Sequence, residues 1–117
     1  MDPRIEGFHA HVYYDAETIG TARRVCEAAR DQLPVVMGRM HEKPVGPHPM
    51  WSCQLAFAPE AFADVMTWLA LHREGLTVFA HLETGDELAD HRDHGIWMGS
   101  MPALDLSLFE KAEGETA

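Results

Sequence analysis

The order in which two hydrophobic periodicities follow one another constrains the fold of this chain more than any other feature. From Ile5 to Tyr14, aromatic and aliphatic residues alternate with polar ones, which is the period-two pattern of a half-buried strand. Behind Asp15, a predicted N-cap, apolar residues recur at spacings of three and four and end before Pro34; they are Ile19, Ala22, Cys26, Ala29 and Leu33. The chain therefore begins with a strand followed by an amphipathic helix.

The same two periodicities then return in a second half. Val35–His41 predicts a second strand, and the segment KPVGPHP that follows is a loop stiffened by three prolines. Alternation over Trp51–Phe57 predicts a third strand, Pro59 opens a second helix, and Leu76–Leu82 predicts a fourth strand. The segment GDELADHRDHGIWMG reads as polar and turn-rich before a short apolar piece around Trp97.

This order, β-α-β-β-α-β, predicts an α+β fold of ferredoxin-like type. In that arrangement two helices pack on one face of an antiparallel four-stranded sheet, here with a short C-terminal extension. A length of 117 residues suits one domain, so we expect a single domain over residues 1–117 with a frayed tail from about Glu110.

Charge and composition exclude several classes of partner. The chain has 9 Lys and Arg against 19 Asp and Glu, and its net charge of −10 disfavours binding to nucleic acid or to anionic membranes. The N-terminus lacks a signal-peptide pattern and no apolar run approaches the roughly 20 residues that cross a bilayer, so the expected location is the cytoplasm. Cys26 and Cys53, the two cysteines, are interpreted as reduced core residues.

Eight histidines are unusual in so short a chain, and strand parity predicts where three of them point. In a ferredoxin-like sheet the first and third strands are central, and the fourth lies antiparallel beside the first. If Phe8 and Ala10 face the helices, then His9, His11 and Tyr13 must face away. The same parity places four further residues on this open face: Phe79, His81, Ser52 and Gln54.

His9, His11 and His81 are therefore predicted metal ligands. Residues two apart on a strand are roughly 6.5 to 7 Å apart, so the imidazoles of His9 and His11 can bind one ion. His81 on the neighbouring strand would complete the ligand set. Imidazole suits zinc, copper, iron and nickel, whereas two histidines with one carboxylate are typical of ferrous sites. Candidate carboxylates are Asp15, Glu42 and Glu83, and a site of histidines alone remains open. An HxH pair on a strand can also be two polar residues on a solvated face.

Other polar residues have two readings each. His48 could act as a ligand or as a proton donor and acceptor, or be an ordinary loop histidine. Arg39 could fork onto a substrate carboxylate, or belong to a surface ion pair. Tyr13 and Gln54 are candidate substrate contacts. A rival cluster of ligand-type residues is interpreted mainly as a solvated loop from which His91 and His94 could reach the site: Asp90, His91, Asp93 and His94.

Four segments of the chain resemble the DOPA 4,5-dioxygenase family of fungi and bacteria: GFHAHVYYDAET, GRMHEKPVGPHPMWSCQLAF, GLTVFAHLETGDELADH and IWMG. The resemblance implies a ferredoxin-like subunit, commonly dimeric, that uses ferrous iron and O₂ to cleave DOPA or a similar catechol. It places the histidine-bearing segments of the family on five residues: His9, His11, His48, His81 and His91. One departure is the sequence Leu82-Glu83, where the resemblance leads us to expect a proline after the histidine.

We therefore expect an extradiol dioxygenase that converts a catechol to a muconic semialdehyde. Fe(II) on His9, His11 and His81 would be served by His48 and His91 as catalytic groups. The open sheet face favours a homodimer that covers part of it. Two alternatives are a noncatalytic module that binds metal or small molecules, and a purely structural dimer whose histidines are incidental.

Overall fold

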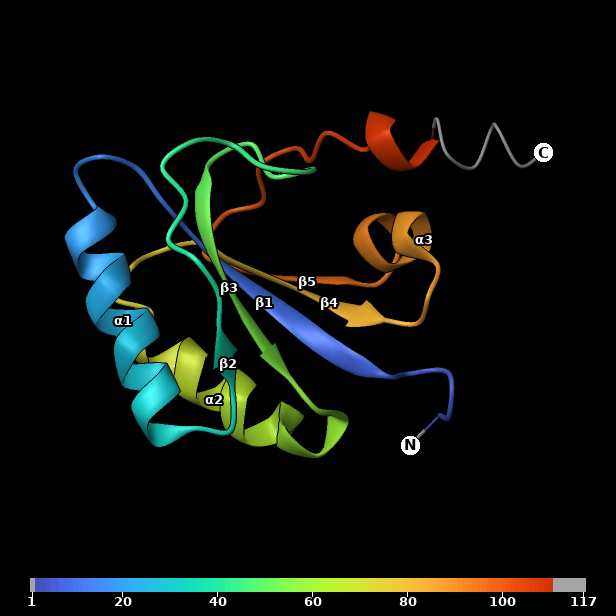
Figure 1. Cartoon of the computed structure of the whole chain (residues 1–117), viewed down its shortest axis with the longest axis horizontal. Helices are drawn as coiled ribbons and strands as arrows, with labels where there is room; N and C mark the ends of the chain where they lie inside the picture. The colour runs from blue at the N-terminus through green and yellow to red at the C-terminus, as the bar shows by residue number, and fades with distance from the viewer. Residues whose placement is uncertain (1, 111–117) are drawn as a thin grey trace.

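The structure, a computed structural model, describes residues 2–110 and is built on one antiparallel sheet (Figure 1). Its strands are β1 (Gly7–Tyr14), β2 (Val36–Met37), β3 (Trp51–Phe57), β4 (Val78–Glu83) and β5 (Gly95–Met98). Their order across the sheet is β2-β3-β1-β4-β5, and every neighbouring pair is antiparallel. The helices are α1 (Ile19–Gln32), the 3-10 turn η1 (Pro59–Ala61), α2 (Phe62–His72) and α3 (Glu87–Arg92).

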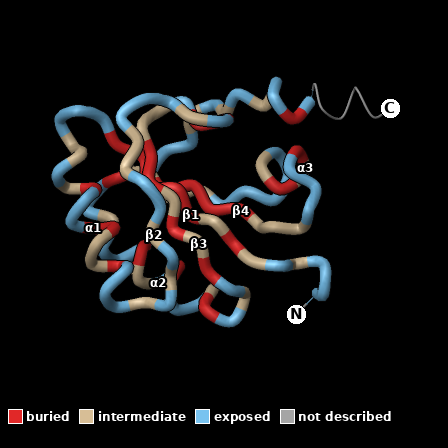
Figure 2. Tube along the Cα trace, viewed as in Figure 1, coloured by how far each residue is buried: buried red, intermediate tan, exposed pale blue. Residues whose placement is uncertain are grey.

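Helices α1 and α2 cover one face of the sheet, and the main core lies beneath them (Figures 1 and 2). The core contains every second residue of β1 together with the apolar faces of both helices, including Val25, Cys26, Val65 and Leu69. Phe8, Ala10, Val12, Val78 and Ala80 belong to it, as strand parity predicted. The side chains between them are therefore on the opposite face, where α3 and the C-terminal segment lie.

The sheet has five strands, so the prediction of four was wrong. The four predicted strands exist, with β1 and β3 inside the sheet and β4 beside β1. The charged segment after them was predicted to be a turn-rich loop, and this prediction was wrong. The segment forms α3 and β5, and β5 adds to the free edge of β4. Asp86 caps α3 by accepting a hydrogen bond from the Ala89 N–H at 3.1 Å. The carboxylate of buried Asp90 accepts bonds from the Thr84 N–H and hydroxyl at 2.8 and 2.7 Å, which fixes the helix to the end of β4.

Two element boundaries also differ from prediction. Asp15 does not cap α1: its carboxylate accepts bonds from the Glu17 and Thr18 N–H groups, so it closes a turn and the helix begins at Ile19. The second strand is two residues long instead of Val35–His41. Beyond it, the N–H groups of Gly38 and His41 still donate to the carbonyls of Gln54 and Ser52 on β3, but three positions of this segment span two of β3, so the regular ladder ends. The hydroxyl of Tyr14 donates to the carbonyl of His41 at 2.7 Å.

After β5, the chain returns across the face that carries α3 (Figure 1). The Asp105 N–H donates to the Pro47 carbonyl at 2.9 Å, and the ring of Phe109 is buried against His91. The frayed tail predicted from Glu110 lies, beyond that residue, outside the described part of the chain. Within residues 2–110, no helix combines the length and apolar character needed to cross a bilayer.

Gly95 offers a test of how tightly the open face is packed. An added Cβ there would lie 2.6 Å from Cε1 of Phe79, a fully buried ring with no room to retreat. We expect Gly95→Ala to lower the free energy of unfolding by about 1–3 kcal/mol, as overpacking typically does. Gly20→Ala is the matched control, because its Cβ would meet nothing within 4 Å and alanine favours the helix. Urea denaturation that finds both variants equally stable would contradict this packing.

Candidate metal centre

His9 and His11 of β1 and His81 of β4 converge on the open face of the sheet. The strand register sets His9 directly opposite His81 and His11 opposite Phe79. One nitrogen from each of the three imidazoles lies within 4.8 Å of the others, which makes them a group that could hold a metal ion. The predicted convergence of these side chains is thus confirmed.

The spacing of two of these nitrogens suits a shared ion. His11 Nε2 and His81 Nε2 are 3.1 Å apart, and two nitrogens bound at about 2.1 Å to one cation lie about 3.0–3.4 Å from each other at angles of 90–110°. His81 Nδ1 lies 3.0 Å from the Leu82 carbonyl, which can only accept, so this nitrogen carries the proton. The Nε2 lone pair of His81 therefore points at His11 and is available to a cation.

Burial keeps these imidazoles neutral. His11 and His81 are 5% and 1% exposed. Burial, with smaller contributions from His48, His81 and other imidazoles, holds the pKa of His11 well below its usual value. Burial likewise lowers the pKa of His81 to about 4, and that of His9, which is less buried, to a smaller extent. Neutral imidazole is the form that coordinates metals, so the three residues are ready as ligands at neutral pH.

His48 stands beside this group on the loop between β2 and β3. Its ring centroid is 4.0 Å from that of His11, and its Nδ1 is 2.7 Å from the hydroxyl of Tyr13. Burial lowers the pKa of His48 to about 4, with further lowering by His91 and His41. Both His48 and Gln54 line a cavity of about 170 Å³ that opens next to His11.

His91 closes the other end of the imidazole cluster, and His94 does not join it. The ring of His91 lies 4.0 Å from that of His81 and 4.6 Å from that of Phe109. Its Nδ1 donates to the Glu87 carbonyl at 2.7 Å, so its Nε2 carries the lone pair. His94 Nδ1 instead lies 3.2 Å from Asp90. The rival cluster is divided: Asp90 and His91 belong to α3, where His91 packs on His81, whereas Asp93 and His94 follow the helix and are exposed, as expected for a solvated loop.

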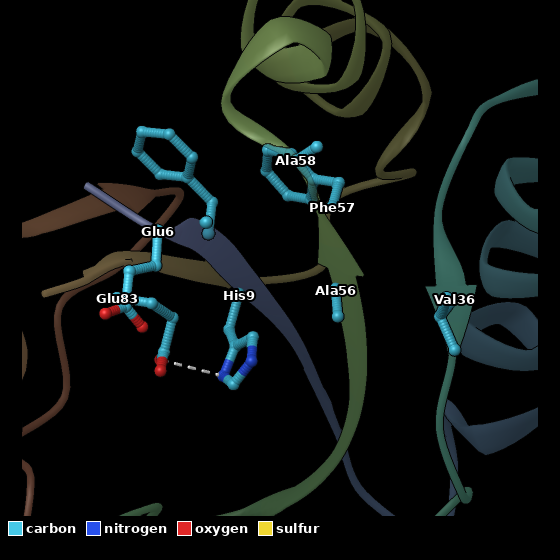
Figure 3. Close-up of a pocket in the computed structure, with 9 residues that line it drawn as sticks. Glu6, His9, Val36, Ala56, Phe57, Ala58 and Glu83 are labelled. Atoms are coloured by element: carbon cyan, nitrogen blue, oxygen red, sulfur yellow. Dashed lines mark ion pairs between the residues drawn. The ribbon is translucent and has the colours of Figure 1, made fainter. Parts of the chain in front are cut away.

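Glu83 is the candidate carboxylate that reaches the histidines. Its Oε1 is 3.1 Å from His9 Nδ1 and 3.4 Å from His81 Nδ1. Figure 3 shows this contact at the edge of a cavity of about 430 Å³ that Glu6, Val36 and Ala56 also line. Burial, then Asp90, Glu87 and Glu6, raise the pKa of Glu83. The two other candidates are elsewhere: Asp15 forms the turn before α1, and Glu42 is exposed on the β2–β3 loop.

Arg39 is exposed on the segment after β2 and lines neither cavity. Two residues that the sequence analysis did not single out contribute to the site: His41 lines the smaller cavity with His48, and Phe109 packs against His91. Phe79, which strand parity placed on the open face, also packs against His91. Phe109 carried no signal, since it lies just before the expected frayed tail.

Two of the comparisons with known proteins name the same family. The model of the Dopa 4,5-dioxygenase family matches residues 8–108. A DOPA 4,5-dioxygenase of Amanita muscaria is 29% identical over 118 residues, covering 92% of this chain and 50% of that protein. An uncharacterized 21.2 kDa protein of Botryotinia fuckeliana is 35% identical over 130 residues, covering 100% of this chain and 71% of that protein. The chain thus spans about half the length of the first relative and most of the second.

A solved structure is also similar. The crystal structure of a protein of Nostoc punctiforme, proposed to be a dioxygenase, superposes with a TM-score of 0.91 at 43% sequence identity, covering 93% of this chain and 95% of that one. The chain is therefore similar to this protein in both sequence and backbone structure over 93% of its length. The family match runs from residue 8 to residue 108 and includes every histidine of the cluster, so the chain belongs to the Dopa 4,5-dioxygenase family.

Proposed function

We propose that the protein is a non-haem iron-dependent extradiol dioxygenase, which opens the ring of DOPA or a similar catechol with O₂ to give a muconic semialdehyde. The observation that carries the proposal is the convergence of His9, His11 and His81. Three neutral nitrogen donors on one side of an ion fit Fe(II) and leave coordination positions open. A ferrous ion bound there would supply the redox chemistry and the positions at which catechol and O₂ are brought together.

The cavity beside the cluster supports a single aromatic ring as substrate. Its volume is about 170 Å³, and a cavity of about 150 Å³ accommodates benzene in another protein. His11, His48, Ser52 and Gln54 are among the residues that line the cavity beside the cluster. A catechol in this cavity would have Gln54 and the His48–Tyr13 pair within reach for hydrogen bonding. Arg39, outside the cavity, would contact a carboxylate on a longer substituent.

In this proposal, His48 takes a proton from the catechol. Its Nε2 can accept only when Nδ1 carries the proton and donates it to the Tyr13 oxygen, 2.7 Å away. With the Tyr13 oxygen as acceptor, His48 would be in the tautomer that acts as a base, and it would return the proton later in the reaction. His91, whose Nε2 also carries a lone pair, would be the second proton acceptor beside His81.

The proposal extends to architecture and assembly. Strands β2-β3-β1-β4 with α1 and α2 would form a ferredoxin-like unit to which β5 is an addition. The subunit would be a cytoplasmic homodimer. Support for a partner surface comes from apolar side chains exposed on the two edge strands, Val36 at 73% and Ile96 at 36%. Light scattering of the purified protein tests the dimer.

The direct test is oxygen consumption with a panel of catechols. The metal-free protein is loaded anaerobically with Fe²⁺ and DOPA and then exposed to air. We expect O₂ uptake together with growing visible absorbance, and loss of both when a chelator is present. Metal and catechol binding without O₂ uptake from any catechol would overturn the enzyme assignment and favour a noncatalytic binding module.

A His48→Gln variant separates proton transfer from metal binding. We expect kcat to fall about 10²- to 10⁴-fold, the usual contribution of a positioned acid–base group, with iron content unchanged. His72→Gln is the control, because His72 is exposed at the end of α2, the helix on the opposite face of the sheet, where it stacks on Trp68. An equal loss of iron and activity in His48→Gln would show instead that His48 is a ligand.

A further inference from the structure

Glu83 contacts the histidine cluster on the side of the Nδ1 atoms of His9 and His81. It ends β4 two residues after His81, so its side chain emerges on the same face of the strand. Its Oε1 is 3.1 Å from His9 Nδ1 and 3.4 Å from His81 Nδ1, as Figure 3 shows for His9. One carboxylate oxygen thus lies between the Nδ1 atoms of two candidate ligands.

The two nitrogens of His81 face different partners. Nδ1 is directed to the Leu82 carbonyl and Glu83, whereas Nε2 is directed to His11 Nε2 at 3.1 Å. A cation held by the two Nε2 atoms would therefore be separated from Glu83 by the imidazole of His81. In this geometry the carboxylate cannot be a ligand and hydrogen-bond to Nδ1 at the same time.

We propose that Glu83 is a positioning residue for the metal site: it accepts the Nδ1–H of His9, steadies His81, and so directs the Nε2 of His9 to the ion. This inference rests on the proposed function for the presence of a metal. A neutral imidazole can carry its proton on either nitrogen, and an acceptor at Nδ1 selects the tautomer with an Nε2 lone pair. The ligand set is then three histidines, with the carboxylate supplying orientation and partial compensation of the cation's charge.

His9 depends on this contact more than the other two ligands do. His81 already has the Leu82 carbonyl as an acceptor for Nδ1, and His11 is almost fully buried among rings. His9 is only half-buried, with its side chain 28% exposed, and Glu83 is its polar contact within the described residues. Loss of Glu83 would leave the ring of His9 free to rotate and to change tautomer.

Metal affinity of three variants tests the proposal. Competition with a chelator for Zn²⁺ or Co²⁺ should show about 10- to 100-fold weaker binding for Glu83→Ala, the usual cost of losing a group that orients a ligand. Glu83→Gln should stay close to the unaltered protein, because its amide oxygen still accepts from Nδ1. Glu6→Ala is the matched control: Glu6 lines the same cavity and carries the same charge, but within residues 2–110 it forms no hydrogen bond or ion pair with a histidine. Its affinity should change little.

A second readout needs no metal. In ¹⁵N spectra of the metal-free protein, His9 should carry its proton on Nδ1, keep it there in Glu83→Gln, and shift toward the Nε2–H form in Glu83→Ala. Three results would overturn the proposal: an unchanged tautomer in Glu83→Ala, equal losses of affinity in Glu83→Ala and Glu6→Ala, or abolished binding in Glu83→Gln, which would make Glu83 a ligand. Neither measurement uses catechol or O₂, so absence of ring cleavage would refute the proposed function and leave this result standing.

Discussion

Replacing His81 with alanine is expected to abolish metal binding and, with it, oxygen uptake in the presence of catechols. His81 is central to the cluster: its Nε2 is 3.1 Å from that of His11, and its ring lies 5.3 Å from that of His9. Since loss of a group that merely orients a ligand already costs about 10- to 100-fold in affinity, loss of this ligand should exceed about 100-fold. Elemental analysis after loading with Fe²⁺ and dialysis measures the effect.

Folding must be separated from ligation in this experiment. His81 is 1% exposed, so removing its side chain leaves a cavity that destabilises the protein on its own. His9→Ala avoids the difficulty because His9 is half-buried at the edge of the cluster, and it should also weaken binding strongly. His72→Ala controls for removal of an imidazole elsewhere. Full metal content in well-folded His81→Ala and His9→Ala would refute the three-histidine site and support incidental histidines.

Strand parity was enough to predict the core of the site. Alternation in β1 fixes His9 and His11 on one face, and the pairing of β4 with β1 brings His81 to them. These inferences depend only on the period of a strand and on which strands are neighbours, and both follow from local patterns in the sequence. They hold even though the strand count was wrong, because β5 adds at an edge and leaves the β1–β4 pairing unchanged.

The remaining parts of the site depend on contacts between segments far apart in the chain. His91 reaches His81 because Asp90, read as a solvated charge, is buried and bonded to Thr84. The second strand is short because the pairing of the following segment with β3 slips by one residue between Gly38 and His41. Glu83 was one of three equal candidates until the distances to His9 and His81 were known. Side-chain hydrogen bonds of this kind leave no periodic signal, so sequence patterns cannot reveal them.

The metal-free protein is expected to lose stability steeply as the pH falls from about 6.5 to about 4. His48 and His81 each have a pKa lowered by burial to about 4, and burial also holds the pKa of His11 well below its usual value. In the unfolded chain these imidazoles bind protons near pH 6.5, whereas in the folded protein His48 and His81 remain neutral until about pH 4. Between these values the unfolded state therefore holds more protons, and acid favours unfolding.

The size of this effect follows from the displacement of the pKa values. Each unit corresponds to about 1.4 kcal/mol, so His48 and His81 each contribute on the order of 3 kcal/mol of stability that is complete above pH 6.5 and lost by pH 4. A typical domain has about 5–15 kcal/mol in total, so the loss should be large enough to unfold the protein. Urea titrations of chelator-treated protein at several pH values measure it. His48→Gln should make the free energy of unfolding depend less on pH, and His72→Gln should not. A free energy of unfolding that stays constant from pH 7 to pH 5 would mean that the imidazoles are not buried together as neutral groups.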